Sequence, residues 1–332
     1  MAVSVRDVAQ AASVSVGTVS NVLNHPDKVA PATVERVQAA IAELGFVRND
    51  AARQLRAGRS RSLGLVVLDV GNPFFAEVAR GAEERAAAQG ISVLLGNSDQ
   101  DADREQAYLD LFREQRVNGV LLTPNQLDPD RIQRLRAAGV PVVLVDAEDG
   151  QTPSVSVDDV EGGYLAVSHL LSLGRRRIAY VAGPLSIRQV ADRLDGARRA
   201  VSEFSDATLE VLESTALDVL QGREAGEALA RRDAADRPDG VFCANDLLAV
   251  GALQGLSILS SVRVPDDIAL IGYDDIAFAA ATVVPLSSIR QPAREIGSTA
   301  VELLFETLDA PDAPARQVHF RPELVVRAST AG

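Results

Sequence analysis

Polar side chains suited to binding a small polyhydroxylated molecule follow apolar runs at several points of this 332-residue chain. Carboxylates, amides and guanidinium groups form paired hydrogen bonds with hydroxyls, and an aromatic ring can cover the apolar face of a sugar or base. Taken singly, such residues are more often helix caps or loop residues. Their recurrence in both halves of the chain instead favours one ligand site. The candidates are Asn72, Phe74, Phe75, Asp146, Arg193, Asn245 and Asp274.

Alternating strands and helices from residue 62 onward would position these side chains. Near-continuous Val, Leu and Ile runs separated by amphipathic helices are typical of parallel sheets covered on both faces. A first series of strands is expected at 62–70, 91–97, 119–124 and 140–146. A second series is expected at 154–158, 177–183, 208–213, 240–246 and 268–275, completed by a last helix near 293–308. Two doubly wound lobes follow, with the ligand cleft at the C-terminal ends of their strands.

The segment VSVGTVSNVLN, residues 14–24, predicts a different kind of contact. Val16, Val19 and Val22 have helical spacing, but the remaining face is small, polar and uncharged, unlike a solvated helix. With a first helix at 4–11 and a third at 31–44, this segment would be the second helix of a helix-turn-helix, which enters the DNA major groove. A plain helical bundle is the alternative. The candidate DNA contacts in this region are Ser4, Ser15, Val16, Gly17, Thr18, Ser20, Asn21 and Asn24.

The stretch NDAARQLRAGRSRS, residues 49–62, is the densest positive run of the chain. It could form barely two helical turns, too few to be stable alone in water. One interpretation is a flexible basic linker. The other is a hinge that becomes helical on DNA, with Leu55 as an apolar wedge in the minor groove. The candidate contacts in this stretch are Asn49, Ala52, Arg53, Leu55 and Arg56.

Charge is divided unevenly along the chain. Residues 1–62 hold eight Lys and Arg against five Asp and Glu, whereas the whole chain has a formal net charge of −13. A basic head on an acidic body indicates that only the head meets a polyanion. Three domains are therefore predicted: a DNA-binding head at 1–48, a hinge at 49–61 and a two-lobed α/β effector domain at 62–332.

Several other classes of protein lack support in the sequence. Three scattered histidines offer no metal-ligand spacing, and the lone Cys243 excludes an internal disulfide and is expected in the core. No cofactor, membrane span or secretion signal is predicted, so a cytoplasmic protein is expected. A periplasmic sugar-binding protein would not use residues 1–62, and the common nucleotide-binding and hydrolase motifs of α/β enzymes are absent.

Four segments, in this order, resemble the lactose-repressor (LacI/GalR) family of bacterial transcription regulators. They are VSVRDVAQAASVSVGTVSNVLN (3–24), NPFFAEVARG (72–81), FCANDLLAVGAL (242–253) and VPDDIALIGYDD (264–275). The resemblance implies a homodimer that binds a palindromic operator, with a body like that of periplasmic sugar-binding proteins. It also implies that Leu55 occupies the hinge-leucine position. Phe74, Asp146, Arg193, Asn245 and Asp274 match positions that line the effector pocket of the family.

Departures from the family pattern concern the head and the C-terminus. Asn21 stands where many members carry Arg, and Ala30 stands where a capping Ser or Thr is common. The sequence ends without a leucine-heptad tail, so a tetramer through a C-terminal coiled coil is not expected. The predicted function is a repressor relieved by a sugar, with corepression by a nucleobase or nucleoside as the alternative.

Overall fold

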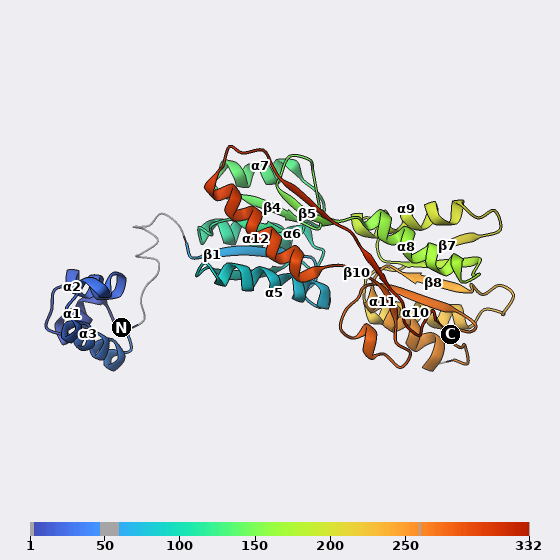
Figure 1. Ribbon diagram of the computed structural model, residues 1–332, viewed down its shortest axis with the longest axis horizontal. Helices are drawn as coiled ribbons and strands as arrows, with labels where there is room; N and C mark the ends of the chain where they lie inside the picture. The colour runs from blue at the N-terminus through green and yellow to red at the C-terminus, as the bar shows by residue number, and fades with distance from the viewer. Residues whose placement is uncertain (1–2, 47–59, 259, 332) are drawn as a thin grey trace. The chain divides into compact units, whose positions relative to one another are not determined.

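The computed structural model describes residues 3–46, 60–258 and 260–331. The chain divides into two compact units, residues 1–59 and residues 60–332 (Figure 1). Each unit has its own hydrophobic core, and each is described by itself.

The first unit is a small helical domain built around a helix-turn-helix. Its elements are α1 (Val5–Ala11), α2 (Val16–Asn24), the 3₁₀ turn η1 (Pro26–Lys28) and α3 (Pro31–Leu44). Val8, Val19 and Val37 pack in a core between the three helices. Gly45 ends α3 with φ +62°, a conformation that glycine adopts without a Cβ clash. As predicted, Ala30 gives α3 no side-chain cap.

The larger unit contains two sheets, and the first is parallel throughout. Its strand order is β11-β5-β4-β3-β1-β2. Alternate side chains of β1 enter different clusters: Leu65 packs with helices α5 and α12, and Val66 with α6 and α7. Both faces are therefore covered, as the apolar runs predict. The bounds are β1 (Ser62–Val67), β2 (Ser92–Asn97), β3 (Val120–Leu122), β4 (Val142–Val145), β5 (Ser154–Val157), β11 (Gln317–Phe320), α5 (Pro73–Ala87), α6 (Ala102–Glu114), α7 (Pro129–Ala137) and α12 (Ala293–Asp309).

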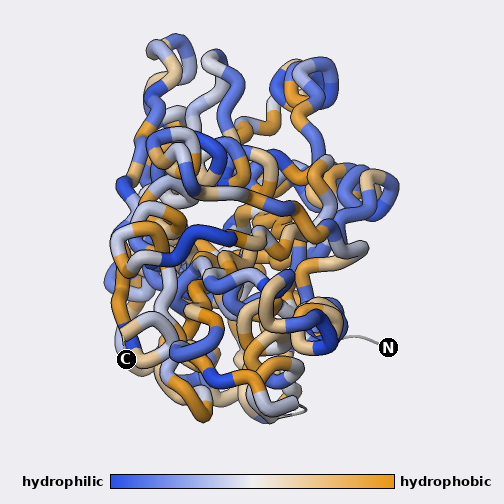
Figure 2. Tube along the Cα trace, turned by 90° about the vertical axis from the view of Figure 1, so that its right-hand side faces the viewer, coloured by the Kyte–Doolittle hydropathy of each residue, from blue (hydrophilic) through white to orange (hydrophobic). Residues whose placement is uncertain are grey.

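The second sheet has the order β12-β10-β9-β8-β6-β7, and only its β10–β12 pair is antiparallel. Tyr180, Phe242 and Tyr273 are fully buried within this lobe, and Cys243 lies in the core as predicted. Figure 2 colours the chain trace by hydropathy, and apolar and hydrophilic stretches alternate along it. The bounds are β6 (Arg177–Ala182), β7 (Thr208–Glu213), β8 (Gly240–Cys243), β9 (Ala269–Asp274), β10 (Ser287–Arg290), β12 (Glu323–Val325), α8 (Asp159–Ser172), α9 (Arg188–Ser202), α10 (Val219–Ala230), α11 (Asp246–Leu253), the π-helical turn η2 (Gln254–Ile258) and the 3₁₀ turn η3 (Ala279–Ala281).

The division of the elements between the lobes differs from the sequence-based prediction. The strand at 154–158 and the last helix were both expected in the second lobe. In the structure β5 pairs with β4 and β11 in the first sheet, and α12 packs against α5 of the first lobe. The chain thus crosses between the lobes several times, and β11 and β12 continue this exchange (Figure 1). Local sequence patterns predict each element but not the sheet it joins.

Two pairs of helices, α8 with α9 and α5 with α12, pack with their backbones in contact. A Cβ on Gly196 of α9 would lie 1.9 Å from the carbonyl oxygen of Val160, and one on Gly163 of α8 would lie 2.0 Å from that of Arg193. These reciprocal glycines let the backbones of α8 and α9 touch, which is impossible for any larger residue. The same reciprocity joins α5 to α12 through Gly81 and Gly297.

Candidate functional site

Helix α2 presents the small polar face predicted from the sequence. Ser15 caps it by accepting a hydrogen bond from the backbone N–H of Thr18 at 3.0 Å. Gly17 and Asn21 are exposed, whereas Val19 and Val22 are buried in the core of the small domain. Val16 is 43% exposed, so it belongs to the outer face and not to the apolar side.

The other predicted DNA contacts of the small domain flank this face. Ser4 caps α1 and exchanges hydrogen bonds with Asp7. Ser20 is half-buried, and Asn24 is exposed. Nδ2 of Asn24 donates a hydrogen bond to the backbone carbonyl oxygen of Ser20 at 2.8 Å. The five contacts predicted in the basic stretch, which are Asn49, Ala52, Arg53, Leu55 and Arg56, lie outside the described residues.

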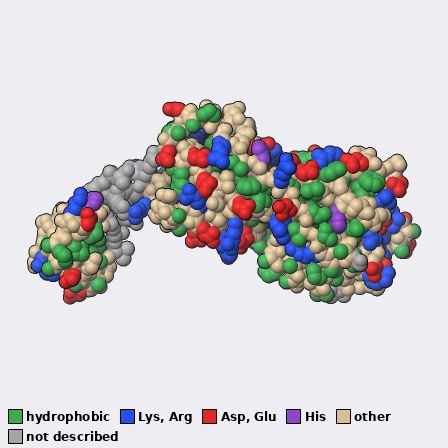
Figure 3. Space-filling model, in the orientation of Figure 1, with side chains coloured by type: hydrophobic (Ala, Val, Ile, Leu, Met, Phe, Trp, Pro, Cys, Tyr) green, Lys and Arg blue, Asp and Glu red, His purple; other side chains and the backbone are tan. Residues whose placement is uncertain are grey.

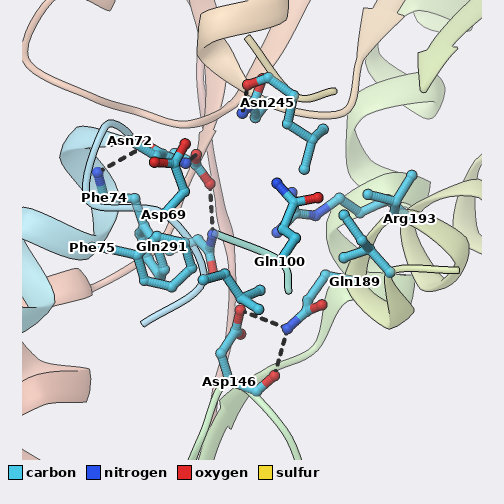
Figure 4. Close-up of a pocket in the computed structure, with 15 residues that line it drawn as sticks. Asp69, Asn72, Phe74, Phe75, Gln100, Asp146, Gln189, Arg193, Asn245 and Gln291 are labelled. Carbon is cyan, nitrogen blue, oxygen red and sulfur yellow. Dashed lines mark hydrogen bonds between the residues drawn. The ribbon is translucent and has the colours of Figure 1, made fainter. Parts of the chain in front are cut away.

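The larger unit has a cleft between its lobes, at the C-terminal ends of the strands (Figure 4). The cavity that the lining side chains leave open is about 40 Å³, below the size range of small-molecule sites. The structure brings all seven predicted ligand residues to this cleft: Asn72, Phe74, Phe75, Asp146, Arg193, Asn245 and Asp274.

The first lobe contributes the aromatic wall. Asn72 caps α5 by accepting from the N–H of Phe74 at 3.0 Å, which places the ring at the start of the helix. Phe74 and Phe75 contact each other edge to face, with ring centroids 5.1 Å apart and planes at 71°. The second lobe supplies aliphatic side chains to the lining, among them Ile187 and Leu217.

Asp146 and Asp274 occupy equivalent places in the two lobes, where β4 and β9 end. Both have left-handed backbones, with φ of +55° and +104°, which non-glycine residues seldom adopt. Burial raises the pKa of each carboxyl above its ordinary value. Such strained and desolvated carboxylates are typical of functional sites.

Hydrogen bonds cross the cleft in both directions. Asn72 of the first lobe donates to Oδ2 of Asp274 in the second lobe at 3.0 Å. Gln189 of the second lobe donates to the carbonyl oxygen and to Oδ2 of Asp146 in the first lobe, at 2.7 and 3.0 Å. Each pair joins an amide to a carboxylate, so hydroxyl groups of a ligand could replace either partner.

Arg193 is held by contacts from three other segments of the second lobe. Its Nε donates to Oδ1 of Asp159 at 2.8 Å, its Nη1 donates to the carbonyl oxygen of Ala244 at 2.6 Å, and its guanidinium lies 3.6 Å from the ring centre of Tyr273. Burial disfavours its charge, but Asp159 and neighbouring acidic groups hold the pKa of Arg193 well above its ordinary value. The guanidinium is therefore a fixed cation beside the cleft.

Asn245 uses its amide to join two segments of the second lobe. Its Oδ1 accepts from the N–H of Leu248 to cap α11, and its Nδ2 donates to the carbonyl oxygen of Leu217.

Four polar residues of the cleft are not among those predicted from the sequence. Asp69 and Gln100 follow strands β1 and β2, and Gln291 follows β10, so the same strand-end signal could have found them. Gln189 lies in the first turn of α9 and carries no such signal. The four residues are Asp69, Gln100, Gln189 and Gln291.

Comparisons with known proteins match both units. The family model of bacterial regulatory proteins of the lacI family matches residues 4–49, and that of the periplasmic binding protein-like domain matches residues 167–330. The HTH-type transcriptional repressor PurR of Aliivibrio fischeri is 34% identical over 334 residues, which cover 98% of each chain. The chain belongs to the lacI family of bacterial regulatory proteins. Its relatives are transcriptional repressors and not enzymes.

Solved structures of the same family agree with this assignment. The Lac repressor dimer bound to operator and the anti-inducer ONPF has a TM-score of 0.85 at 28% identity and covers 100% of each chain. The transcriptional regulator CelR in complex with cellobiose has a TM-score of 0.72 at 31% identity, over 98% of this chain and 99% of that one. This member of the lacI family is therefore a DNA-binding transcription regulator whose larger unit is an effector-binding domain.

The described residues contain neither a candidate membrane span nor a candidate metal cluster. Among residues 3–46, 60–258 and 260–331, none of the helices is long and apolar enough to cross a membrane. Within the same ranges no group of three or more His, Cys, Asp or Glu side chains is arranged to hold a metal ion.

Proposed function

We propose that this regulator binds a palindromic operator as a homodimer in the cytoplasm and represses transcription until a sugar enters the cleft between its lobes. The observation that carries the proposal is the pair of amide–carboxylate contacts across the cleft, Asn72–Asp274 and Gln189–Asp146. They place acceptors and donors from both lobes around one space. A ligand that engages both lobes can favour one lobe arrangement, and regulation requires such differential affinity.

The number of hydrogen-bonding groups in the lining favours a sugar over a nucleobase. Phe74 and Phe75 form one apolar wall, and the aliphatic Ile187, Val190 and Leu217 also line the cleft. A sugar needs one apolar surface and many hydrogen-bonding groups. Three carboxylates, several amides and Arg193 supply those groups.

We propose that a second copy of the chain covers an exposed apolar edge of the first lobe. Strand β2 is the edge of the first sheet, and its Leu94 and Leu95 are 37% and 48% exposed. Leu111 on α6 is 43% exposed. An apolar edge strand left open invites uncontrolled pairing, so a specific partner is expected there. A homodimer would also supply the two heads that a palindrome requires.

The small domain is the proposed DNA reader. Ser15, Gly17 and Asn21 allow α2 to approach base edges closely. On the face of residues 60–332 shown in Figure 3, acidic and basic side chains are interspersed, and most of the ion pairs found involve Arg. That face therefore offers no uniformly basic surface to compete with the head for DNA.

The test combines a DNA titration and a ligand screen on the full chain. We expect binding to an inverted repeat from the DNA upstream of its own gene, with affinity falling steeply as salt rises because counterions are released. Equal affinity for an isolated half-site would contradict the homodimer. In a thermal-shift screen, sugars should raise the melting temperature and nucleobases should not, because only a ligand of the native state stabilises it.

A further inference from the structure

The charged residues of the effector cleft are unequally divided between the two signs. Three carboxylates line the cleft, those of Asp69, Asp146 and Asp274. Arg193 is the one cation among the described residues of the lining, and its Nε is already paired with Oδ1 of Asp159 at 2.8 Å. The lining therefore holds no cation that is free to balance an acidic ligand.

Asp146 and Asp274 have amide partners within the lining. Asp274 accepts from Nδ2 of Asn72 at 3.0 Å and from Nε2 of Gln291 at 2.8 Å. Asp146 accepts from Nε2 of Gln189 at 3.0 Å. An amide satisfies a carboxylate oxygen without cancelling its charge, so a further negative charge in the cleft would be repelled.

The donors of the lining are directed at acceptors of the protein itself. Besides the three amides that bond the carboxylates, Nδ2 of Asn245 donates to the carbonyl oxygen of Leu217 at 3.0 Å. Arg193 likewise uses Nε and Nη1 within its own lobe. A phosphate or carboxylate group brings acceptors and no donors, so it would have to displace these hydrogen bonds.

Acceptors, in contrast, are in excess. Oδ1 of Asp146 and Oε1 of Gln291 are buried and accept no hydrogen bond from any described residue. Both residues belong to the lining of the cleft. A buried acceptor without a donor is costly, so a ligand that brings donors is favoured. The hydroxyl groups of a sugar are such donors.

Helix starts commonly bind anions, but those at the cleft are already in use. Asn72 and Asn245 cap α5 and α11 by accepting from backbone N–H groups. Helix α9 begins without a side-chain cap, and Gln189 in its first turn bonds the carboxylate of Asp146. A carboxylate is thus already present beside the one of these three helix starts that lacks a cap.

We propose that the cleft binds an uncharged sugar through its free hydroxyls and rejects sugar phosphates and sugar acids. The inference rests on the proposed function, because it takes the cleft as the effector site, and it narrows the class of ligand. Asp69 is the carboxylate best suited to test it. Its Oδ1 accepts from the N–H of Gly71 at 2.7 Å, and among the described residues no Lys or Arg pairs with it.

Isothermal titration of the full chain compares each neutral compound with its anionic form. The pairs are ribose with ribose 5-phosphate, glucose with glucose 6-phosphate, cellobiose with cellobionate, and guanosine with guanosine 5′-monophosphate. We expect a sugar to bind and its anionic form to bind at least about 100-fold more weakly, because of charge repulsion in a poorly solvated cleft. An anionic form that binds as tightly as its neutral form would overturn the inference and leave a sugar effector in place.

The guanosine pair separates this inference from the proposed function. Binding of guanosine by a chain that binds none of the sugars would overturn the sugar effector. The affinity of guanosine 5′-monophosphate would then decide whether the cleft rejects anions. A chain that binds none of the neutral compounds would contradict both proposals.

Matched variants assign the rejection of anions to the cleft. Asp69→Asn keeps the acceptor for Gly71 but removes one negative charge, so the anionic form should gain at least about fivefold in affinity relative to the neutral form. Asp195→Asn removes the same charge at an exposed residue outside the lining and should leave this ratio unchanged. Asp274→Asn is the second test variant should Asp69→Asn fold poorly. Equal shifts of the ratio in the cleft variant and in Asp195→Asn would show that net charge, and not the cleft, excludes anions.

Discussion

Asn72 donates a hydrogen bond to Asp274 across the cleft at 3.0 Å, although 202 residues separate the two in the sequence. Asn72 also caps α5 through its Oδ1, and Asp274 accepts a second hydrogen bond from Gln291 at 2.8 Å. One side chain therefore begins a helix of the first lobe and holds a carboxylate of the second. Changes at this contact should alter lobe arrangement and ligand binding together.

Asn72→Asp separates the two roles of this residue. Aspartate keeps the acceptor that caps α5 but places a carboxylate against Asp274, so the contact becomes repulsive. We expect effector binding to weaken at least tenfold while the free energy of unfolding falls by no more than about 2 kcal/mol. Calorimetry and urea unfolding measure the two quantities. Unchanged effector affinity would show that this contact does not control the site.

Asp274→Ala should weaken the effector by about 2 kcal/mol or more, because a charge-assisted hydrogen bond to a ligand hydroxyl is lost. DNA binding without effector should survive. Arg193→Ala should weaken the effector as well, but it also leaves Asp159 buried without its cation, at a cost of about 3–5 kcal/mol in stability. Arg193→Lys is the milder companion variant. If calorimetry finds wild-type effector affinity in all three variants, the ligand site lies elsewhere.

Gly196→Ala tests how the pairing of α8 with α9 positions Arg193. The added Cβ would meet the carbonyl oxygen of Val160 at 1.9 Å, so the helices must separate. We expect a loss of about 1–3 kcal/mol in the free energy of unfolding, and weaker effector binding because Arg193 moves away from Asp159. Ser202→Ala, at an exposed position near the end of the same helix, is the control and should change stability by less than about 0.5 kcal/mol. A stable Gly196→Ala variant with normal effector affinity would contradict this account.

Asp246 should make stability depend on pH. Burial is the main cause of its raised pKa, although Ser288 and the N–H of Ile276 donate to it at 2.7 and 2.8 Å. A raised folded-state pKa means that the protonated form is favoured by folding. The stabilisation that the protonated Asp246 gives to the folded state is full below the unfolded-state pKa of about 3.9. It is lost as the pH rises through the folded-state pKa.

Asp246→Asn removes this titration, so the wild type should lose free energy of unfolding relative to the variant as the pH rises from about 4 to 8. Urea unfolding at several pH values measures the difference. Asp195→Asn, at an exposed site, should show no such trend. A difference between wild type and Asp246→Asn that stays constant with pH would rule out the assignment.

Leu55→Ala tests the predicted hinge, which lies outside the described residues. Because α2 offers no Arg for a paired guanine contact, added specificity is expected from an apolar wedge in the minor groove. We expect operator affinity to fall by about 1–3 kcal/mol, with nonspecific DNA and effector binding nearly unchanged. Titration of operator and scrambled DNA at one salt concentration measures both. Equal losses on the two DNAs, or none, would indicate a plain basic tether.

Local signals in the sequence were sufficient for the elements and for much of the cleft. Ser4 and Ser15 cap α1 and α2, and Gly45 ends α3, because a cap acts within a few residues of its helix. Asp146 and Asp274 were recognisable because parallel strands bring their C-terminal ends to one edge. Val16 has the same helical spacing as the buried Val19 and Val22, but it is exposed, because its exposure depends on how the short helix packs in its domain.

Tertiary structure alone decided which distant segments meet. The sequence by itself predicted a strand at 154–158 and a helix near 293–308, but both join the first lobe. Sheet order and helix pairing depend on contacts between segments far apart in the chain. Gln189 carries no recognisable signal within its helix, yet it reaches Asp146 across the cleft. Hydrophobic periodicity and capping act over a few residues, whereas a site between lobes depends on the packing of the whole unit.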